Sequence, residues 1–264
     1  MPEFWQTICP PWFRVPNGYE LEGTGVLIRI GDRRFLLTAA HVLDKAHDGP
    51  LHFGLPIGYV EVSGVSKITA VPSAGREADH VDLAFVAIDE HVAKLLADSF
   101  AFLPITYIDV MDEGKEGTPY IVNGCPWKKV RKDGRTFRPN IYELKLTGRK
   151  HQEYPSMELA RETHIAMEFD PKKMTNGLDR RVEAPKLNGV SGGPVWKAVR
   201  VDEQNKKPVL TKRLAGIVIE HRKERRTLVA TRVAGVLAGI AHPFPHLAQA
   251  IPQNPKMEIM CRNV

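Results

Sequence analysis

Short apolar runs, separated by glycine, proline and charged residues, follow one another along most of this 264-residue chain. The first clear pair is VLIRI and RRFLLT within residues 23–44. Gly31 and Asp32 join them, and a glycine-first pair is typical of a two-residue hairpin turn. Residues 80–89 are almost continuously apolar, which predicts a strand covered on both faces. This succession of short strands and turns predicts an all-β fold, either a barrel or a sandwich.

A second series of strands is predicted after residues 104–118, where apolar residues become sparse and turn residues frequent. We therefore expect one domain over residues 1–110 and a second over residues 111–264. The strands predicted in the second domain cover residues 119–124, 136–148, 163–169, 213–222 and 226–233. Helices are predicted at residues 90–99 and from Val233 onward, where Pro243 and Pro245 interrupt the pattern.

The charge and composition favour a soluble protein without a nucleic-acid partner. The formal net charge of +6 is modest for this length, and 43% of the residues are hydrophobic. Basic residues gather at 128–135 and 221–226, but no aromatic residues alternate with them as they would on a surface for single-stranded nucleic acid. Solvent-exposed hairpins explain these clusters better. No apolar run reaches the roughly 18 residues of a membrane span, so no membrane association is expected.

The first residues and the cysteines point to the cytoplasm. The N-terminal sequence has no basic stretch followed by an apolar one, so it does not resemble a secretory signal. Cys9, Cys125 and Cys261 are odd in number and far apart, which is typical of a reducing compartment. No two of them have the spacing of zinc ligands, so neither a metal nor another cofactor is expected.

The stretch LNGVSGGPVW, residues 187–196, carries the strongest chemical signal. Glycine-rich runs mark sharp bends or close approaches of the backbone, so one interpretation is a tight turn alone. The other is a turn that presents Ser191 as a nucleophile. With Gly189 two residues earlier, the N–H groups of Gly189 and Ser191 can then point into one small space. Such a pair of donors forms an oxyanion hole.

A serine nucleophile needs a base and a group that orients the base. His41 follows a hydrophobic strand, with Ala39 and Ala40 leaving room around its ring. A lone histidine is more often structural than catalytic. Asp82 begins the buried run of residues 80–89, where a carboxylate is costly unless it is paired. Taken alone, Asp82 is equally well explained as a strand cap or an ion-pair partner, and Asp79 is a rival carboxylate in a more polar context.

The three signals follow one another as histidine, aspartate and serine, in the local sequences TAAHV (38–42), DLAF (82–85) and GVSGGPVW (189–196). This order and these motifs resemble the chymotrypsin-like serine peptidases. GTGVLI (23–28) and LVATRV (228–233) are also similar to strands of that family, so the resemblance covers roughly residues 20–250.

The resemblance implies two six-stranded antiparallel β-barrels, an active site in the cleft between them, and a C-terminal helix. His41 and Asp82 would come from the first barrel and Ser191 from the second. His41 would act as the general base, and Asp82 would hold its tautomer. Gly189 and Ser191 would supply the oxyanion hole.

The same resemblance implies an uncharged specificity pocket. Val190 stands where digestive members carry the aspartate that pairs with a newly cleaved N-terminus, so activation by such cleavage is not expected. Pro185 stands where trypsin has the aspartate of its pocket, and Leu228 stands where the family often has glycine. Both changes predict a shallow apolar pocket and cleavage after small or medium apolar residues.

Further substrate contacts are assigned on the same basis. The strand GIVIEHR would bind the substrate backbone, with Ile219, Glu220 and His221 facing the cleft. Asn188 is also assigned to substrate binding. Glu220 is the feature among these that could attract a basic side chain.

The leading hypothesis is an intracellular trypsin-like serine endopeptidase of the bacterial type without a PDZ module. It would hydrolyse protein or peptide substrates through an acyl-enzyme, under the control of a regulatory protein partner in a bacterial stress or defence system. The alternative is a catalytically silent module of the same fold that binds or scaffolds other proteins. Nucleic-acid binding through the basic hairpins is the third and least favoured reading.

Overall fold

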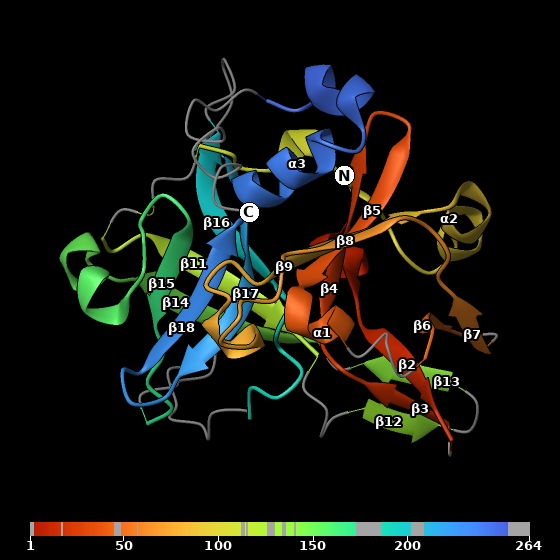
Figure 1. Ribbon diagram of the computed structural model, residues 1–264, viewed down its shortest axis with the longest axis horizontal. Helices are drawn as coiled ribbons and strands as arrows, with labels where there is room; N and C mark the ends of the chain where they lie inside the picture. The colour runs from red at the N-terminus through yellow and green to blue at the C-terminus, as the bar shows by residue number, and fades with distance from the viewer. Residues whose placement is uncertain are drawn as a thin grey trace.

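The computed structural model of the chain describes residues 3–16, 18–44, 49–56, 58–111, 114, 116–125, 130–133, 136–139, 141–172, 186–201 and 209–252. Most of this part is β structure, which confirms the expected all-β fold. Figure 1 shows two groups of strands, with β4, β5, β8 and β9 in one and β11 and β14–β18 in the other. Helix α3 packs against β9 of the first group and β17 of the second.

The second half of the chain closes into a six-stranded barrel. Its strands are antiparallel and are hydrogen-bonded in the order β11-β14-β15-β18-β17-β16. Their bounds are β11 (Pro119–Gly124), β14 (Tyr142–Gly148), β15 (His164–Glu168), β16 (Pro194–Val201), β17 (Val209–Arg222) and β18 (Thr227–Arg232). The run predicted at 136–148 contains both β14 and β13 (Thr136–Pro139), which pairs with β12 (Val130–Asp133) as a separate ribbon.

The strands of the first half divide between two sheets. The six-stranded sheet contains β1 (Ile8–Cys9), β4 (Gly25–Ile30), β5 (Arg33–Ala39), β8 (Ser66–Ile68), β9 (Leu83–Ile88) and β10 (Leu103–Pro104). The four-stranded sheet contains β2 (Pro11–Val15), β3 (Gly18–Leu21), β6 (Leu51–Leu55) and β7 (Gly58–Glu61). The predicted hairpin is β4–β5, and its turn needs glycine because Gly31 has φ of 57°. All six residues of β9 are buried, as its apolar run predicted.

The helices are short and connect or cover the strands. The α-helices are α1 (Ala40–Asp44), α2 (Glu90–Leu96) and α3 (Val233–Ala241). The 3-10 helices are η1 (Phe4–Thr7), η3 (Arg76–Ala78), η4 (Ile105–Tyr107), η6 (His151–Glu153), η7 (Pro155–Met157) and η8 (Pro245–Ala250). Both predicted helices are present, α3 being the C-terminal helix. Within the described part of the chain, no helix combines the length and apolar character that crossing a lipid bilayer requires.

One apolar cluster joins the two halves. Phe35 and Leu37 of β5 lie in it beside Trp196 of β16, Leu214 of β17 and Leu237 of α3, and all five are fully buried. Burial of this much apolar surface fixes the two halves relative to each other. The division at residues 110 and 111 stays a prediction.

Candidate active site

The turn that carries Ser191, residues 189–193, has the backbone that its glycines predicted. Gly189 has φ of 89° and Gly192 has φ of 81°, values that side-chain-bearing residues rarely adopt. Two hydrogen bonds anchor the turn to β17. The N–H of Gly192 donates to the Val218 carbonyl at 2.7 Å, and the N–H of Val218 donates to the Gly193 carbonyl at 2.8 Å. We call residues 189–193 the nucleophile turn.

The glycines of the nucleophile turn also permit a close approach to the first half of the chain. A Cβ atom on Gly192 would lie 2.0 Å from the carbonyl oxygen of Thr24 and 2.1 Å from Oγ1 of Thr38. Within the second half, a Cβ atom on Gly193 would lie 2.2 Å from the carbonyl oxygen of Asn123 in β11. The turn is therefore both a sharp bend and a contact surface.

Thr24 links the nucleophile turn to the strand that leads into the His41 hairpin. Its hydroxyl donates to the Gly189 carbonyl at 2.6 Å and accepts from the Cys125 N–H at 2.8 Å. Its own N–H donates to the Ser191 carbonyl at 2.8 Å. Thr24 is wholly buried, and sequence reasoning did not identify it as a site residue. The sequence feature that could have identified Thr24 is its position in GTGVLI, directly before a predicted strand.

His41 and Asp82 are held together by two hydrogen bonds. Nδ1 of His41 lies 2.6 Å from Oδ2 of Asp82, and the His41 backbone N–H donates to Oδ1 at 2.9 Å. Asp82 is 6% exposed, while the side chain of His41 is 36% exposed. An ionised carboxylate only accepts, so Nδ1 carries the proton in this pair. That tautomer leaves Nε2 of His41 with a free lone pair.

Asp82 occupies a turn with an uncommon backbone conformation. Its φ is 43°, in the left-handed region where aspartate is better tolerated than most residues. Its carbonyl accepts from the Ala40 N–H at 3.0 Å, which ties the turn to the start of α1. Asp82 is thus held to the His41 segment through both its side chain and its main chain.

Asp79, the rival carboxylate, caps this turn, and among the described residues no hydrogen bond or ion pair joins it to His41. Burial by itself raises the pKa of Asp79, but hydrogen bonds from the backbone of Asp82, the hydroxyl of Thr69, the backbone of Val81 and the side chain of Arg76 outweigh it. The pKa of Asp79 is consequently below its ordinary value, and the carboxylate stays ionised.

Ser191 lies close to the His41 segment through its main chain. A Cβ atom on Gly23 would meet both Cγ2 of Val42 at 2.6 Å and the Ser191 carbonyl oxygen at 2.8 Å. Among the residues that the structure describes, no hydrogen bond joins the Ser191 hydroxyl to His41. Catalytic hydrogen bonds often form or tighten only when substrate binds, so the missing bond between Ser191 and His41 is compatible with catalysis.

The two N–H groups expected in the oxyanion hole have no protein acceptor in the described part of the chain. Within the described residues, neither the N–H of Gly189 nor that of Ser191 donates to a protein acceptor. Their neighbours in the turn, Val190, Gly192 and Gly193, all donate to carbonyl oxygens. As far as the described residues go, the two donors that the resemblance assigns to a developing oxyanion are thus not used inside the protein.

A cleft of about 520 Å³ opens beside His41 and Asp82. Two of the residues predicted to bind substrate, Ile219 and Glu220, line it. The remaining lining residues are charged or titratable: Arg76, Glu77, Asp79, His80 and Arg222. Glu220 is already paired, because its carboxylate lies 2.7 Å from Nε of Arg222. Attraction of a basic substrate side chain by Glu220 would have to compete with this internal ion pair.

The other predicted specificity residues lie in three different settings. His221 packs edge-on against Phe169, with ring centroids 5.1 Å apart, and burial lowers its pKa. Leu228 is 1% exposed and belongs to the apolar cluster that contains Phe169 and Val190. Asn188 is exposed, and Pro185 lies outside the described residues. The shallow apolar pocket therefore stays a prediction, and Leu228 offers no exposed surface to a substrate in this structure.

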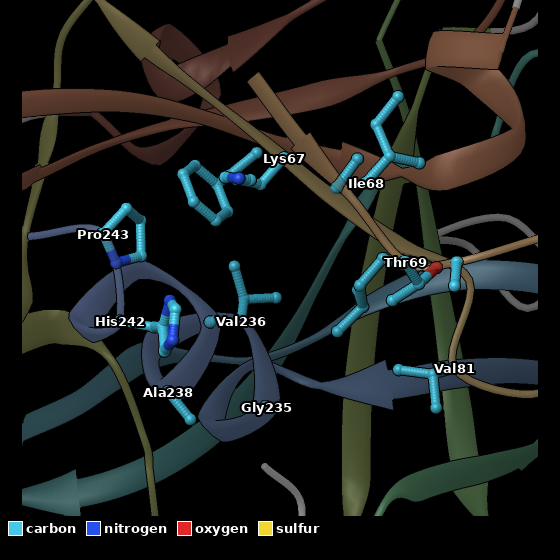
Figure 2. Close-up of a pocket in the computed structure, with 14 residues that line it drawn as sticks. Lys67, Ile68, Thr69, Val81, Gly235, Val236, Ala238, His242 and Pro243 are labelled. Atoms are coloured by element: carbon cyan, nitrogen blue, oxygen red, sulfur yellow. Dashed lines mark hydrogen bonds between the residues drawn. The ribbon is translucent and has the colours of Figure 1, made fainter. Parts of the chain in front are cut away.

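A second hollow, of about 440 Å³, lies between α3 and the strands β8 and β9 (Figure 2). Thr69 and Val81 lie on one side of it, and Val236 and His242 lie on the other. Leu83 also lines it, so the residues on both sides of Asp82 border this hollow.

The described residues contain no group of three or more histidine, cysteine, aspartate or glutamate side chains that could hold a metal ion. Cys9 and Cys125 are buried free thiols. Burial raises the pKa of Cys125 to about 12, and burial together with the neighbouring Cys125 raises that of Cys9. Neither thiol is a reactive nucleophile in this state.

Comparison with known proteins bears on the family. The family model of the trypsin-like peptidase domain matches residues 23–200. Neuropsin, a serine protease expressed in the limbic system of mouse brain, superposes with a TM-score of 0.57 at 16% identity over 92% of this chain and 96% of its own. Granzyme C superposes with a TM-score of 0.54 at 20% identity over 91% of this chain and 95% of its own.

The search of curated proteins found no match to this chain. At such low identities the two solved structures establish the fold alone, which is the two-barrel, trypsin-like fold that the motifs implied. The family match spans well over half of the chain and includes His41, Asp82 and Ser191. The chain therefore belongs to the family of trypsin-like peptidase domains.

Proposed function

We propose that this protein is a serine endopeptidase in which Ser191 is the nucleophile, His41 the general base and Asp82 the group that orients the base. The observation that carries the proposal is the two-point contact between Asp82 and His41. Because a carboxylate accepts hydrogen bonds, this contact keeps the imidazole proton on Nδ1. Nε2 can then take a proton, as a general base must.

In the proposed reaction, Oγ of Ser191 attacks the carbonyl carbon of the scissile peptide bond while its proton passes to Nε2 of His41. The tetrahedral intermediate collapses as His41 gives that proton to the leaving amine, and an acyl ester on Ser191 remains. Water then attacks the ester, passing a proton to His41, and the second collapse returns the proton to Ser191. Asp82 stabilises the imidazolium in both halves of the cycle.

The N–H groups of Gly189 and Ser191 would hold the negative charge of each tetrahedral intermediate. Loss of one such donor typically costs about 100- to 1,000-fold in kcat, which is large but less than the roughly million-fold cost of losing the nucleophile or the base of such a triad. The positive φ of Gly189 and the hydrogen bonds of the nucleophile turn support this role, because they fix the turn before substrate arrives.

Protein or peptide chains are the proposed substrates. Pro185, which stands where trypsin has the aspartate of its pocket, carries no charge, and the Glu220 carboxylate in the cleft beside His41 is already paired with Arg222. We propose cleavage after small or medium apolar residues.

We also propose an intracellular setting, with the peptidase as a regulated effector under a protein partner in a bacterial stress or defence system. The unpaired thiols of Cys9 and Cys125 support a reducing compartment. Val190, which is 2% exposed, supports regulation by some means other than pairing with a cleaved N-terminus.

The second candidate function is a catalytically silent module that binds proteins through the same fold. The observation that favours it is the missing hydrogen bond between Ser191 and His41 in the described part of the chain. A catalytically silent module would keep the fold and its cleft, but its Ser191 would not form an acyl ester.

Labelling with a fluorophosphonate, followed by intact mass measurement, separates these functions. We expect one adduct on the wild-type protein and none on Ser191→Ala. Ser156→Ala is the matched control, because Ser156 is exposed and its hydroxyl bonds only the nearby Glu153 carbonyl. Adduct formation on Ser156→Ala should equal that of the wild type. A folded wild-type protein that never forms the adduct would favour the binding module.

A further inference from the structure

We infer that Arg76 is a positioning residue, which sets the geometry of the His41–Asp82 pair by bridging the two segments that carry them. This inference rests on the proposed function. Arg76 begins η3 in the segment between β8 and β9 and is predicted by none of the motifs. Its side chain is 14% exposed and lies in the cleft wall beside His41.

One end of the bridge is the helix that carries His41. Nε of Arg76 lies 2.7 Å from Oδ2 of Asp44, and Nη2 lies 2.9 Å from Oδ1. This is a bidentate pair, the geometry that restrains both partners most strongly. Asp44 is the last residue of α1, and His41 is the second residue of the same helix. Arg76 therefore restrains the helix that presents the base.

The other end of the bridge is the turn that carries Asp82. Nη1 of Arg76 donates to Oδ2 of Asp79 at 2.5 Å and to the Thr69 carbonyl at 2.9 Å. Asp79 in turn accepts from the Val81 N–H at 3.0 Å and from the backbone of Asp82. The guanidinium thus reaches Asp82 through one intervening carboxylate, three residues earlier in the chain.

Polar contacts to this turn matter because of the backbone conformation that it holds. On one side of the turn, Val81 and Leu83 border the hollow of Figure 2 and pack in the apolar cluster that also contains Val236 of α3. The turn also holds Asp82 at φ of 43°, a conformation that persists only when its surroundings impose it. The hydrogen bonds of Asp79, Thr69 and Arg76 contribute to imposing it. The bonds that the Asp82 carbonyl accepts from the Ala40 N–H and that the Val81 carbonyl accepts from the Thr231 hydroxyl act with them.

Arg76 is not built as a receptor for an acidic substrate, although it lines the cleft. Its one positive charge faces two carboxylates, those of Asp44 and Asp79, and three of its nitrogen atoms already donate to them. A substrate carboxylate would have to displace one of these partners. These bonds favour a structural role for Arg76, as a link between two segments, over a role in binding a substrate anion.

The test compares Arg76→Met, Arg76→Lys and Asp44→Asn with the wild-type protein. Arg149→Met is the matched control, because Nη1 of Arg149 pairs with Glu153 at 2.6 Å and its side chain is similarly exposed at 20%, away from the cleft. Three quantities are measured: kcat and KM on a peptide substrate, the rate of fluorophosphonate labelling, and the downfield NMR resonance of the His41 Nδ1 proton. His41→Ala assigns that resonance.

We expect Arg76→Met to lower kcat and the labelling rate by about 10- to 100-fold with KM within about twofold, because small misplacements of catalytic groups have costs of that size. The Nδ1 proton resonance should broaden or disappear. Arg76→Lys, which keeps a cation, should recover part of the activity and of the resonance. For Asp44→Asn, we expect kcat and the labelling rate to lie between those of the wild type and those of Arg76→Met. Arg149→Met should match the wild type in all three measurements.

A folded Arg76→Met protein with the wild-type Nδ1 resonance would overturn the inference, whatever its activity. This experiment distinguishes failure of the proposed peptidase function from failure of the proposed role of Arg76. Absence of Ser191-dependent labelling in the wild type would refute the peptidase function. The Nδ1 proton resonance would still decide whether Arg76 positions the His41–Asp82 pair.

Discussion

The hydroxyl of Thr24 donates a 2.6 Å hydrogen bond to the carbonyl oxygen of Gly189, across a separation of 165 residues in the chain. This bond joins the strand that leads toward His41 to the turn that carries Ser191. It also gives a buried carbonyl its partner inside the protein, where an unpaired one costs about 1–3 kcal/mol. Residues from both halves of the chain thereby share one hydrogen-bonded unit.

Replacing Thr24 with valine should impair catalysis more than it impairs folding. Thr24→Val keeps the shape of the side chain but leaves the Gly189 carbonyl and the Cys125 N–H without their shared hydroxyl. We expect a loss of about 1–3 kcal/mol in the free energy of unfolding. We also expect kcat to fall by about 10- to 100-fold, because the oxyanion donors lose their fixed direction. Urea unfolding and steady-state kinetics measure the two effects.

Two variants control for this experiment. Thr24→Ser keeps the hydroxyl and should retain most of the activity. Thr227→Val removes an equally buried hydroxyl, which donates to the Arg225 carbonyl at 2.9 Å, away from the nucleophile turn. It should retain the wild-type kcat. Equal losses of kcat in Thr24→Val and Thr227→Val would show that Thr24 has no special link to the site.

Adding a methyl group at Gly192 should be strongly destabilising. The new Cβ would lie about 2 Å from two oxygen atoms, those of Thr24 and Thr38, at a backbone φ of 81°. Steric overlap and strain together predict a loss above about 3 kcal/mol in the free energy of unfolding, or failure to fold.

Gly239→Ala is the contrasting change, because its Cβ would meet Phe85 at an ordinary 3.9 Å inside α3. Alanine favours a helix over glycine, so this variant should be neutral or gain about 0.5–1 kcal/mol. Denaturant unfolding of both variants measures the difference. Similar stabilities would contradict the close approach at Gly192.

His164 should make the folded state less stable in acid. Its ring is buried, Nε2 lies 2.6 Å from the His80 carbonyl, and Nδ1 accepts from the Ala160 N–H at 3.1 Å. Burial lowers the pKa of His164 below that of the unfolded chain, about 6.5. As the pH falls below about 6.5, His164 therefore binds a proton in the unfolded chain while its imidazole stays neutral in the folded protein. The free energy of unfolding should drop by up to about 1.4 kcal/mol per pH unit until the folded pKa is reached.

Urea unfolding at pH 7.5 and 5.5 tests this linkage. His164→Gln cannot titrate, so its stability should change less between the two pH values than that of the wild type. His246→Gln, at an exposed histidine, is the control for the loss of an imidazole. Identical pH dependence in the wild type and His164→Gln would rule out a contribution from His164.

A digest of a peptide library should show cleavage after small or medium apolar residues. Pro185 carries no charge where trypsin has the aspartate of its pocket, and the Glu220 carboxylate is already paired with Arg222. Mass spectrometry of the products, with Ser191→Ala as the blank, identifies the cleaved bonds. Products ending mainly in arginine or lysine would show that Glu220 leaves Arg222 and binds the substrate.

The strands were largely predictable because their patterns are local. The β4–β5 hairpin, the fully buried β9, the strand at 119–124 and the start of α3 at Val233 all follow from short runs and turn residues. How the first half divides into two sheets was not predictable. That division depends on which strands exchange hydrogen bonds, and such partners are far apart in the chain.

The sequence alone determined which residues to examine at the site, because TAAHV, DLAF and GVSGGPVW each lie in one short segment. Only the tertiary structure decided how those residues are held. The contacts of Thr24 with Gly189, and of Arg76 with Asp44 and Asp79, join segments that no local pattern relates. The burial of Leu228 likewise depends on which side chains fill the barrel around it. Hydrogen-bond direction and burial are set by the paths of other segments, so they exist only once the chain has folded.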